Sequence, residues 1–328
     1  MNIKRTILYT VFLLSATLAG RGQTQSTSVF NFLELPTSAH GMALGGQNVS
    51  LTDDDASLLM QNPALMSNVS DRSLNLSFLT YMRGCKSGSA SWVMASGERG
   101  TWGVGVQFVG YGTLRETTVE GIEMGDFSAL DMAISGGYSY TLTEYLAGGA
   151  TGKFIYSHYG EFSSVALAVD LGLNAYNEQR DLSVSLVAAN LGGQVHRFGD
   201  HHERLPFDLR AGITKRLESA PLQFTMTLTD LTRWRDSDFY SSKGTVGFGR
   251  KLTNHFAIGL DILPIEQLYI SAGFNFRRAY EMKAAGSSHG AGLCFGAGVK
   301  LKRFKLDVAY AKYHVSAPSF LFNAQYTL

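Results

Sequence analysis

The residues best suited to catalysis lie in one short segment. Residues 286–290 read Gly-Ser-Ser-His-Gly, which matches a hydrolase nucleophile elbow, with Ser288 as the nucleophile of ester cleavage and His289 beside it. An elbow needs a strand before its turn and a helix after it, whereas we expect a strand to start at Gly290. Neighbouring loop residues also need not share a face or carry an orienting carboxylate. We therefore interpret the segment as a polar loop and predict that the protein is not an enzyme.

Two further groups carry the donor atoms that metal ions use. His196, His201 and His202 could offer imidazoles to a transition metal, but no cysteine or close spacing accompanies them, so a solvated loop is favoured. The three aspartates at 53–55 lack the alternating spacing, the glycine and the distal glutamate of a calcium loop. Helix capping is the favoured role for these aspartates. We expect no metal and no cofactor.

The two cysteines, Cys85 and Cys294, are too few to build a disulfide framework. Both are expected toward the outer rim of the predicted barrel, with one or two strands between them. We expect free thiols, with a disulfide as the alternative.

The elements that position these residues are strands. Residues 221–231 show the pattern most clearly, because Leu222, Phe224 and Met226 alternate with Gln223 and Thr225. The same alternation recurs about fourteen times after residue 70. We predict strands at 72–82, 87–96, 101–111, 129–141, 144–157, 163–176, 181–191, 207–217, 221–231, 255–263, 267–277, 290–302, 304–313 and 318–328. Residues 244–252 would give an odd number and are assigned to a loop.

The connections alternate between tight and long, which predicts an all-β fold, a transmembrane antiparallel β-barrel with an even strand number. Tight turns, expected on the periplasmic side, lie at 97–100, 142–143, 177–180, 218–220, 264–266 and 303. Longer outer loops are expected at 112–128, 192–206, 232–254 and 278–289, with shorter ones at 83–86 and 314–317. A soluble β-sandwich could produce similar alternation but explains so many uniform strands less well.

Charges and aromatic residues indicate which face is which. Charges opposite the apolar row of their strands, and therefore predicted to face the lumen, are Asp131, Asp170, Asp208, Arg210, Asp261, Lys305 and Asp307. A basic residue at the lipid midplane would cost about 2–4 kcal/mol. Aromatic girdles are expected from Tyr81, Tyr111, Tyr156 and Tyr310 at outer strand ends and from Trp102, Tyr138, Tyr140 and Tyr145 at inner ones.

Composition and the N-terminus complete the domain plan. A net charge of +1 gives no reason to expect nucleic-acid binding. Residues 1–22 read as a cleaved signal peptide, with Lys4 and Arg5 before an apolar run too short to span a membrane. Residues 23–70 lack strand alternation and are predicted to form a plug, with a short helix at 56–60 capped by the aspartates. Residues 71–328 form the predicted barrel, integral to the outer membrane.

Two stretches carry a family resemblance. The first comprises Ser28-Val29-Phe30-Asn31-Phe32-Leu33-Glu34-Leu35-Pro36, Ser38-Ala39, Ala43-Leu44-Gly45-Gly46, Asp53-Asp54-Asp55 and Gln61-Asn62-Pro63-Ala64-Leu65. The second, within 254–310, comprises His255, Gly259, Ala272-Gly273-Phe274-Asn275, Arg277-Arg278, Gly290-Ala291-Gly292, Phe295-Gly296 and Ala309-Tyr310. Together they resemble PorQ-type proteins of the type IX secretion system, in the PorV/PorQ group that is similar to FadL-like barrels. His40 stands where this resemblance suggests a basic residue.

The resemblance implies a fourteen-stranded FadL-like barrel with an N-terminal hatch and no catalytic residues. It also implies an anchor for a surface-exposed PorZ-like partner, within the cell surface attachment complex that links cargo to lipopolysaccharide. The hatch motif is Phe32, Leu33, Leu35, Pro36, Gly45, Gly46, Asp53, Asp54, Asp55, Asn62, Pro63 and Ala64.

Loop residues with the composition of contact surfaces are Arg233, Trp234, Arg235, Phe239, Tyr240, Arg278, Tyr280, His196 and Arg197. An aromatic girdle with charged headgroup contacts is the alternative reading of these loops. The alternative function is FadL-like transport of hydrophobic small molecules, with the stretch 29–35 entering an apolar lumen.

Overall fold

The computed structural model describes residues 28–81, 84–117, 123–199, 202–235, 238–239, 246–282, 290–313 and 318–328. The predicted signal peptide, His201, Tyr240, Ser288 and His289 lie outside the described residues. Among the residues described, no helix is both long enough and apolar enough to cross a membrane.

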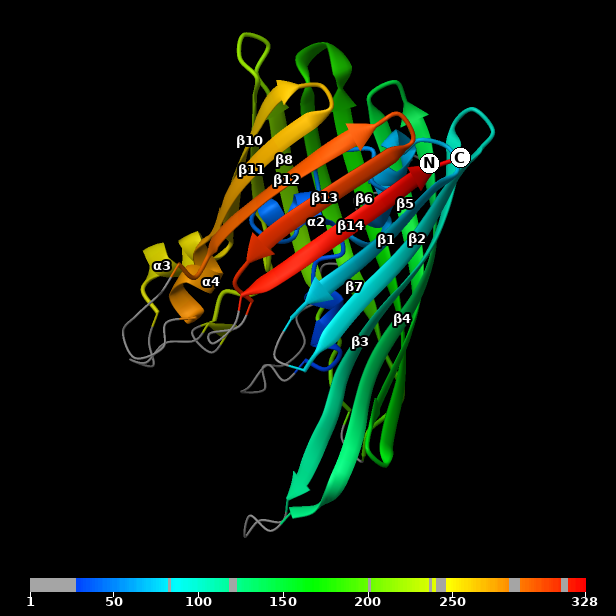
Figure 1. Cartoon of the computed structure of the whole chain (residues 1–328), viewed down its shortest axis with the longest axis vertical. Coiled ribbons are helices and arrows are strands. Elements are labelled where there is room, and N and C mark those ends of the chain that lie inside the picture. Colours follow the sequence, from blue (N-terminus) through cyan, green and yellow to red (C-terminus); the bar gives the residue numbers. More distant parts are fainter. Residues whose placement is uncertain are drawn as a thin grey trace, which may run out of the picture.

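Fourteen antiparallel strands close into a barrel in which each strand pairs with its sequence neighbours and β1 pairs with β14 (Figure 1). The prediction of the fold class is confirmed, and the β-sandwich is excluded. The strands are β1 Ser73–Thr80, β2 Lys86–Ser96, β3 Gly100–Thr117, β4 Glu123–Thr143, β5 Leu146–Tyr159, β6 Phe162–Asn177, β7 Leu182–His196, β8 Asp208–Arg216, β9 Leu222–Leu228, β10 Phe256–Ile265, β11 Leu268–Asn275, β12 Leu293–Leu301, β13 Phe304–Ala311 and β14 Ser319–Thr327.

Alternation along each strand separates an apolar exterior from a polar interior. On β6, Leu167 and Leu171 are 54% and 48% exposed, while Asp170 between them is 1% exposed. All seven charges predicted to face the lumen are buried inside the barrel. An apolar belt this continuous requires hydrocarbon around it. The protein is an outer-membrane barrel.

The two rims differ as the turn lengths predicted (Figure 1). The short-turn rim carries the connections after β2, β4, β6, β8, β10 and β12, and the loop rim carries the others. One predicted loop is wrong: β3 and β4 continue through most of 112–128 as a paired hairpin that extends beyond the other strands. Likewise β7 runs to His196, so the loop expected at 192–206 starts later. Residues 244–252 contain no described strand but the start of α3, Phe248–Asn254.

The aromatic residues are divided between the two faces of the wall. Trp102, Tyr140 and Tyr145 are exposed near the short-turn rim, as a girdle requires. Tyr111 and Tyr81 do not belong to the outer girdle, because Tyr111 donates a hydrogen bond to lumenal Asp131 and Tyr81 packs on a buried cluster. The predicted position was wrong because odd-numbered residues face inward along β1 and β3, and both tyrosines continue that alternation.

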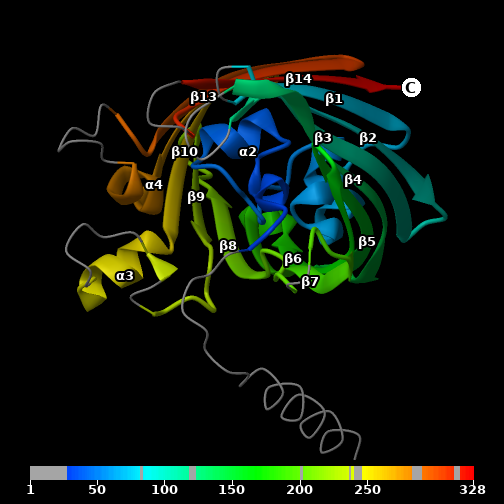
Figure 2. The same ribbon diagram turned by 90° about the horizontal axis from the view of Figure 1, so that it is seen from below.

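The residues before β1 form a hatch, defined here as residues 28–72, that fills the lumen (Figure 2). Its helical elements are η1 Asn31–Glu34, α2 Ala39–Ala43, η2 Ala56–Met60 and η3 Pro63–Asn68. The predicted helix at 56–60 is present as the 3₁₀ helix η2. Its N-cap is Asp55, whose carboxylate accepts from the Ser57 backbone N–H at 2.8 Å.

Glycines on the inner wall form the seat for this hatch. A Cβ built on Gly149 would lie 2.5 Å from the Pro63 carbonyl carbon and 2.7 Å from the Ala64 nitrogen. A Cβ on Gly273 would lie 2.6 Å from the Gly45 nitrogen. Any larger residue at these positions would displace backbone, so the glycines set how deeply the hatch sits. The other inward glycines in comparable contact are Gly103, Gly105, Gly172, Gly212, Gly259 and Gly296.

Replacing the η2 cap tests whether the hatch is held by its own buried polar groups. The Asp55 carboxylate also accepts hydrogen bonds from Ser38 Oγ at 2.7 Å and Asn75 Nδ2 at 3.0 Å. Asp55→Ala leaves these buried donors unpaired, which we expect to cost about 2–4 kcal/mol of hatch stability. Hydrogen exchange of residues 38–70 should accelerate in Asp55→Ala and much less in Asp55→Asn. Unchanged protection in the alanine variant would contradict this role.

Candidate functional site

Buried ion pairs fix α2 and the following aspartates to the barrel wall. His40 Nδ1 lies 2.7 Å from Asp53 Oδ2, and His40 Nε2 lies 3.1 Å from Asp261 Oδ1 on β10. Lys305 on β13 forms a second ion pair with Asp53. The His40 ring stacks on Tyr269, with centroids 3.8 Å apart. We call these five residues the hatch lock.

The hatch lock keeps its groups charged. Burial opposes the charge on His40, but the carboxylates of Asp261 and Asp53 outweigh it and raise the pKa of His40 to about 10. Burial likewise opposes the charge on Asp53, yet Lys305 and His40 hold the pKa of that carboxyl well below its usual range. These contacts favour the protonated, cationic form of His40.

The other hatch-motif residues have structural roles. Asp54 accepts hydrogen bonds from Ser70 and pairs with Lys300 at 2.7 Å. Asn62 caps η3 and donates to the Val49 carbonyl at 2.7 Å, while Pro63 occupies the first turn of that helix. Gly45 and Gly46 adopt positive φ angles of 113° and 124°, which favour glycine. These contacts provide capping and seating within the hatch.

The predicted partner-binding residues occupy different environments on the loop rim. Arg233 pairs with Asp230 at 3.0 Å, and Arg277 pairs with the same carboxylate. Trp234 is 41% exposed. Arg278 points inward, donating to the Gly45 carbonyl and lying 4.3 Å from the Tyr313 ring centroid, so it holds the hatch instead of facing outward.

The remaining loop candidates also lie on this rim. Arg235 and Phe239 follow Trp234, and the Phe239 ring packs edge-on against His255. Tyr280 lies in α4, Phe276–Glu281, under the Arg250 guanidinium. His196 ends β7, and Arg197 follows it.

The other chemical candidates can be assessed only where their residues are described. The described residues contain no cluster of three or more His, Cys, Asp or Glu side chains able to hold a metal ion. Cys85 and Cys294 are free thiols, as expected, and Cys294 is buried.

A cavity lies between η1 and the wall strands β3, β4 and β5. Its volume is about 270 Å³, and aromatic rings surround it. The rings form a chain in which Phe30 and Phe198 are 6.2 Å apart, Phe198 and Tyr159 5.4 Å, and Tyr159 and Tyr111 5.9 Å. The other lining residues are Val29, Asn31, Phe32, Asp131 and Ser157. We call this space the aromatic cavity.

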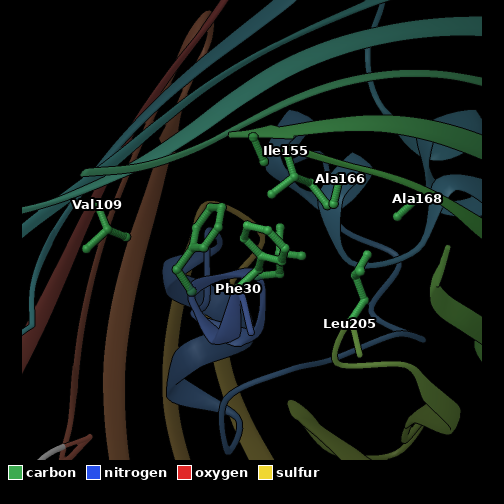
Figure 3. Close-up of a cluster of buried hydrophobic side chains, with 9 residues drawn as sticks. Phe30, Val109, Ile155, Ala166, Ala168 and Leu205 are labelled. Atoms are coloured by element: carbon green, nitrogen blue, oxygen red, sulfur yellow. The ribbon is translucent and has the colours of Figure 1, made fainter. Parts of the chain in front are cut away.

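Apolar packing supports the aromatic cavity. Phe30, Phe32 and Leu33 of the hatch pack with small and branched residues of the wall (Figure 3). Those wall residues include Val109, Ile155, Ala166 and Ala168, with Leu205 from the segment between β7 and β8. Phe30 has a φ of 61°, a conformation uncommon for a bulky residue. Strained residues of this kind concentrate at binding sites.

Sequence reasoning placed Asp131 in the lumen and noted the stretch 29–35 but did not bring the two together. The missed signal was the spacing of Tyr111, Asp131 and Tyr159, which share a face only once the strand register is known. Phe198 belongs to a connection with no periodic pattern, so nothing in the sequence indicated its place.

No protein-family model and no curated protein match the chain. Solved structures do share its fold. The toluene transporter TodX of Pseudomonas putida is 14% identical with a TM-score of 0.57, covering 91% of this chain and 98% of TodX. The monoaromatic hydrocarbon channel CymD is 13% identical with a TM-score of 0.56, covering 90% and 98%. A FadL homologue of Pseudomonas aeruginosa is 10% identical with a TM-score of 0.51, covering 88% and 98%. The architecture is therefore FadL-like.

Proposed function

We propose that the protein lets small, predominantly apolar molecules cross the outer membrane, with the aromatic cavity as their binding site. The observation that carries the proposal is this partly open space of about 270 Å³, lined by rings from both hatch and wall. Concave sites with aromatic walls and a few polar groups are typical of small-molecule binding. The likeness to barrels described as a toluene transporter and a monoaromatic hydrocarbon channel supports the same substrate class.

Passage requires part of the hatch to yield, and η1 differs from α2 because no buried ion pair among the described residues holds it to the wall. Its wall contacts include two long hydrogen bonds from Gln107 Nε2, 3.2 Å to the Phe32 carbonyl and 3.4 Å to the Leu35 carbonyl. An ion pair between Glu34 and Arg233 spans 3.8 Å and is partly exposed. The hatch lock holds α2 with buried charges, so η1 can move while the rest of the hatch stays seated.

Uptake by liposomes that contain the purified barrel tests this proposal. Labelled ethylbenzene should enter faster than into empty liposomes, and Phe30→Ala should lower the binding affinity by about 2–10-fold because one ring of the cavity is lost. Phe248→Ala provides the matched control, since Phe248 is 73% exposed on α3 and does not line the cavity. Uptake equal to that of empty liposomes would refute the proposal.

A second candidate is an anchor of the type IX secretion system attachment complex that holds a PorZ-like surface protein and contacts outer-membrane lipid or lipopolysaccharide. The favouring observation is that Asp230, Arg233 and Arg277 hold the loop rim in one arrangement beside exposed Trp234. Deleting residues 232–254 should release a surface partner captured in mild detergent while the barrel stays inserted. Retention of the partner would count against docking by this segment.

A further inference from the structure

Among the residues that the structure describes, the carboxylate in the aromatic cavity has no basic partner. Asp131 is 1% exposed, and its oxygens accept hydrogen bonds from Tyr111 Oη at 2.6 Å, Tyr159 Oη at 2.8 Å and Ser157 Oγ. All three donors are neutral hydroxyl groups. Within the described part of the chain, no lysine, arginine or histidine forms an ion pair with Asp131.

Two other buried carboxylates of the wall do have basic partners. Asp170 lies 2.6 Å from Lys153 Nζ, and Asp208 lies 2.5 Å from Arg210 Nε. A buried anion without a countercharge is costly, which is why buried charges are usually paired. Asp131 differs from these two because it lines a cavity large enough to admit a molecule.

The rings around this carboxylate add to its preference for a positive charge. The faces of Phe and Tyr rings attract organic cations, and aromatic cages commonly recognise ammonium groups. Tyr111 and Tyr159 donate their hydroxyl protons to Asp131, which leaves the lone pairs of both phenol oxygens able to accept from a ligand. Cavity, rings and carboxylate therefore favour the same kind of ligand.

We propose that the aromatic cavity selects small organic ammonium ions, such as arylalkylamines, over neutral molecules of the same shape. The ring of the ligand packs among Phe30, Phe198 and Tyr159, and its ammonium group lies beside Asp131 and the phenol oxygens. A volume of about 270 Å³ limits the ligand to roughly one aromatic ring with a short chain. This inference deepens the proposed function and rests on it for transport but not for binding.

Calorimetry with the full-length barrel in detergent tests the inference, using phenethylammonium and ethylbenzene, which has the same ring and two-carbon chain without the ammonium group. The native protein should bind phenethylammonium at least about tenfold more tightly than ethylbenzene. Asp131→Asn should remove that preference by weakening phenethylammonium binding at least about tenfold while leaving ethylbenzene binding unchanged. Asp126→Asn is the matched control, because Asp126 is an exposed aspartate on the same strand. A heat-shift on gels confirms that each barrel is folded.

The possible outcomes separate this inference from the proposed function. The inference is overturned if the native protein binds both molecules equally, or if the Asp131→Asn variant keeps the preference for phenethylammonium. In either case, uptake of ethylbenzene by liposomes would still support transport. Asp131-dependent binding of phenethylammonium without uptake of either molecule supports the inference and refutes transport. If Asp131→Asn does not fold, Asp131→Ser also removes the carboxylate, keeps a hydroxyl group for the surrounding hydrogen bonds, and should likewise abolish the preference for phenethylammonium. Preference unchanged in that variant overturns the inference.

Discussion

Gly149→Val should unseat the hatch and open the barrel. The Cβ alone would lie 2.5–2.7 Å from backbone atoms of Pro63 and Ala64, and backbone cannot rotate away as a side chain can. Valine adds two further methyl groups on the inner face of β5, where η3 packs. We expect planar-bilayer recordings to show channels at least about tenfold more conductive than the native protein, because the hatch no longer fills the lumen.

The matched control for this variant lies one strand away. Gly136 on β4 faces outward, and nothing lies within 4 Å of a Cβ built there. Gly136→Val therefore adds the same side chain to the lipid face and should conduct like the native barrel. Both variants should keep the heat-shift of a folded barrel. Native-like conductance in Gly149→Val would show that η3 yields locally and that the glycine seat does not hold the hatch.

Strand positions were predictable because the constraint on them is local. Every second residue must suit hydrocarbon, so Leu167 and Leu171 flanking a buried Asp170 identify a strand and its inner face together. A second local rule located the η2 cap, since Asp55 precedes residues of helical character and its carboxylate can accept from a free N–H. Neither prediction required knowledge of the neighbouring strands.

Features that depend on several strands at once were not predictable. Residues 112–128 have the composition of a loop, yet much of this segment extends the hairpin of β3 and β4. Beyond the apolar belt the two strands are stabilised by pairing with each other, which leaves no apolar alternation in the sequence. The glycines of the hatch seat come from at least seven strands, and each is unremarkable in its own segment. The aromatic cavity needs the register of β3, β4 and β5 as well as the path of η1. The periodicity of a single segment does not indicate which residues of other strands it will contact.

The contacts of the hatch imply a division of labour within it. Its later part, from α2 to η3, is fixed by buried ion pairs, caps and backbone contact with glycines. In contrast, η1 is held by packing, by hydrogen bonds from Gln107 and Gln47, and by the partly exposed ion pair of Glu34 with Arg233. A gate needs one segment that moves and another that keeps the barrel closed to large solutes. The later part provides the closure, and η1 borders the aromatic cavity.

Raising the pH should release α2 from the wall. The pKa of His40 is raised from its ordinary value of 6.5 to about 10, so protonated His40 favours the seated hatch. Its contribution to hatch stability is complete below about pH 6.5, falls as the pH rises, and is lost above about pH 10. The pKa of Asp53 is lowered, so its contribution is present above its ordinary value of 3.8 and is lost only in stronger acid. The contribution of these two groups to hatch stability should therefore be greatest between about pH 3.8 and pH 6.5.

The buried thiol of Cys294 reports this transition. Cys294 is fully buried and packs with Ala39, Met42 and Ala43 of α2, so it becomes accessible only when α2 leaves. In a Cys85→Ser background, its labelling rate by a methanethiosulfonate reagent, divided by the rate in the unfolded chain at the same pH, should rise several-fold between pH 7 and pH 10.5. His40→Gln cannot carry the charge, so its normalised rate should be high at pH 7 already and nearly flat. A native rate that stays flat over this range would mean that Lys305 and Asp53 hold the hatch without His40.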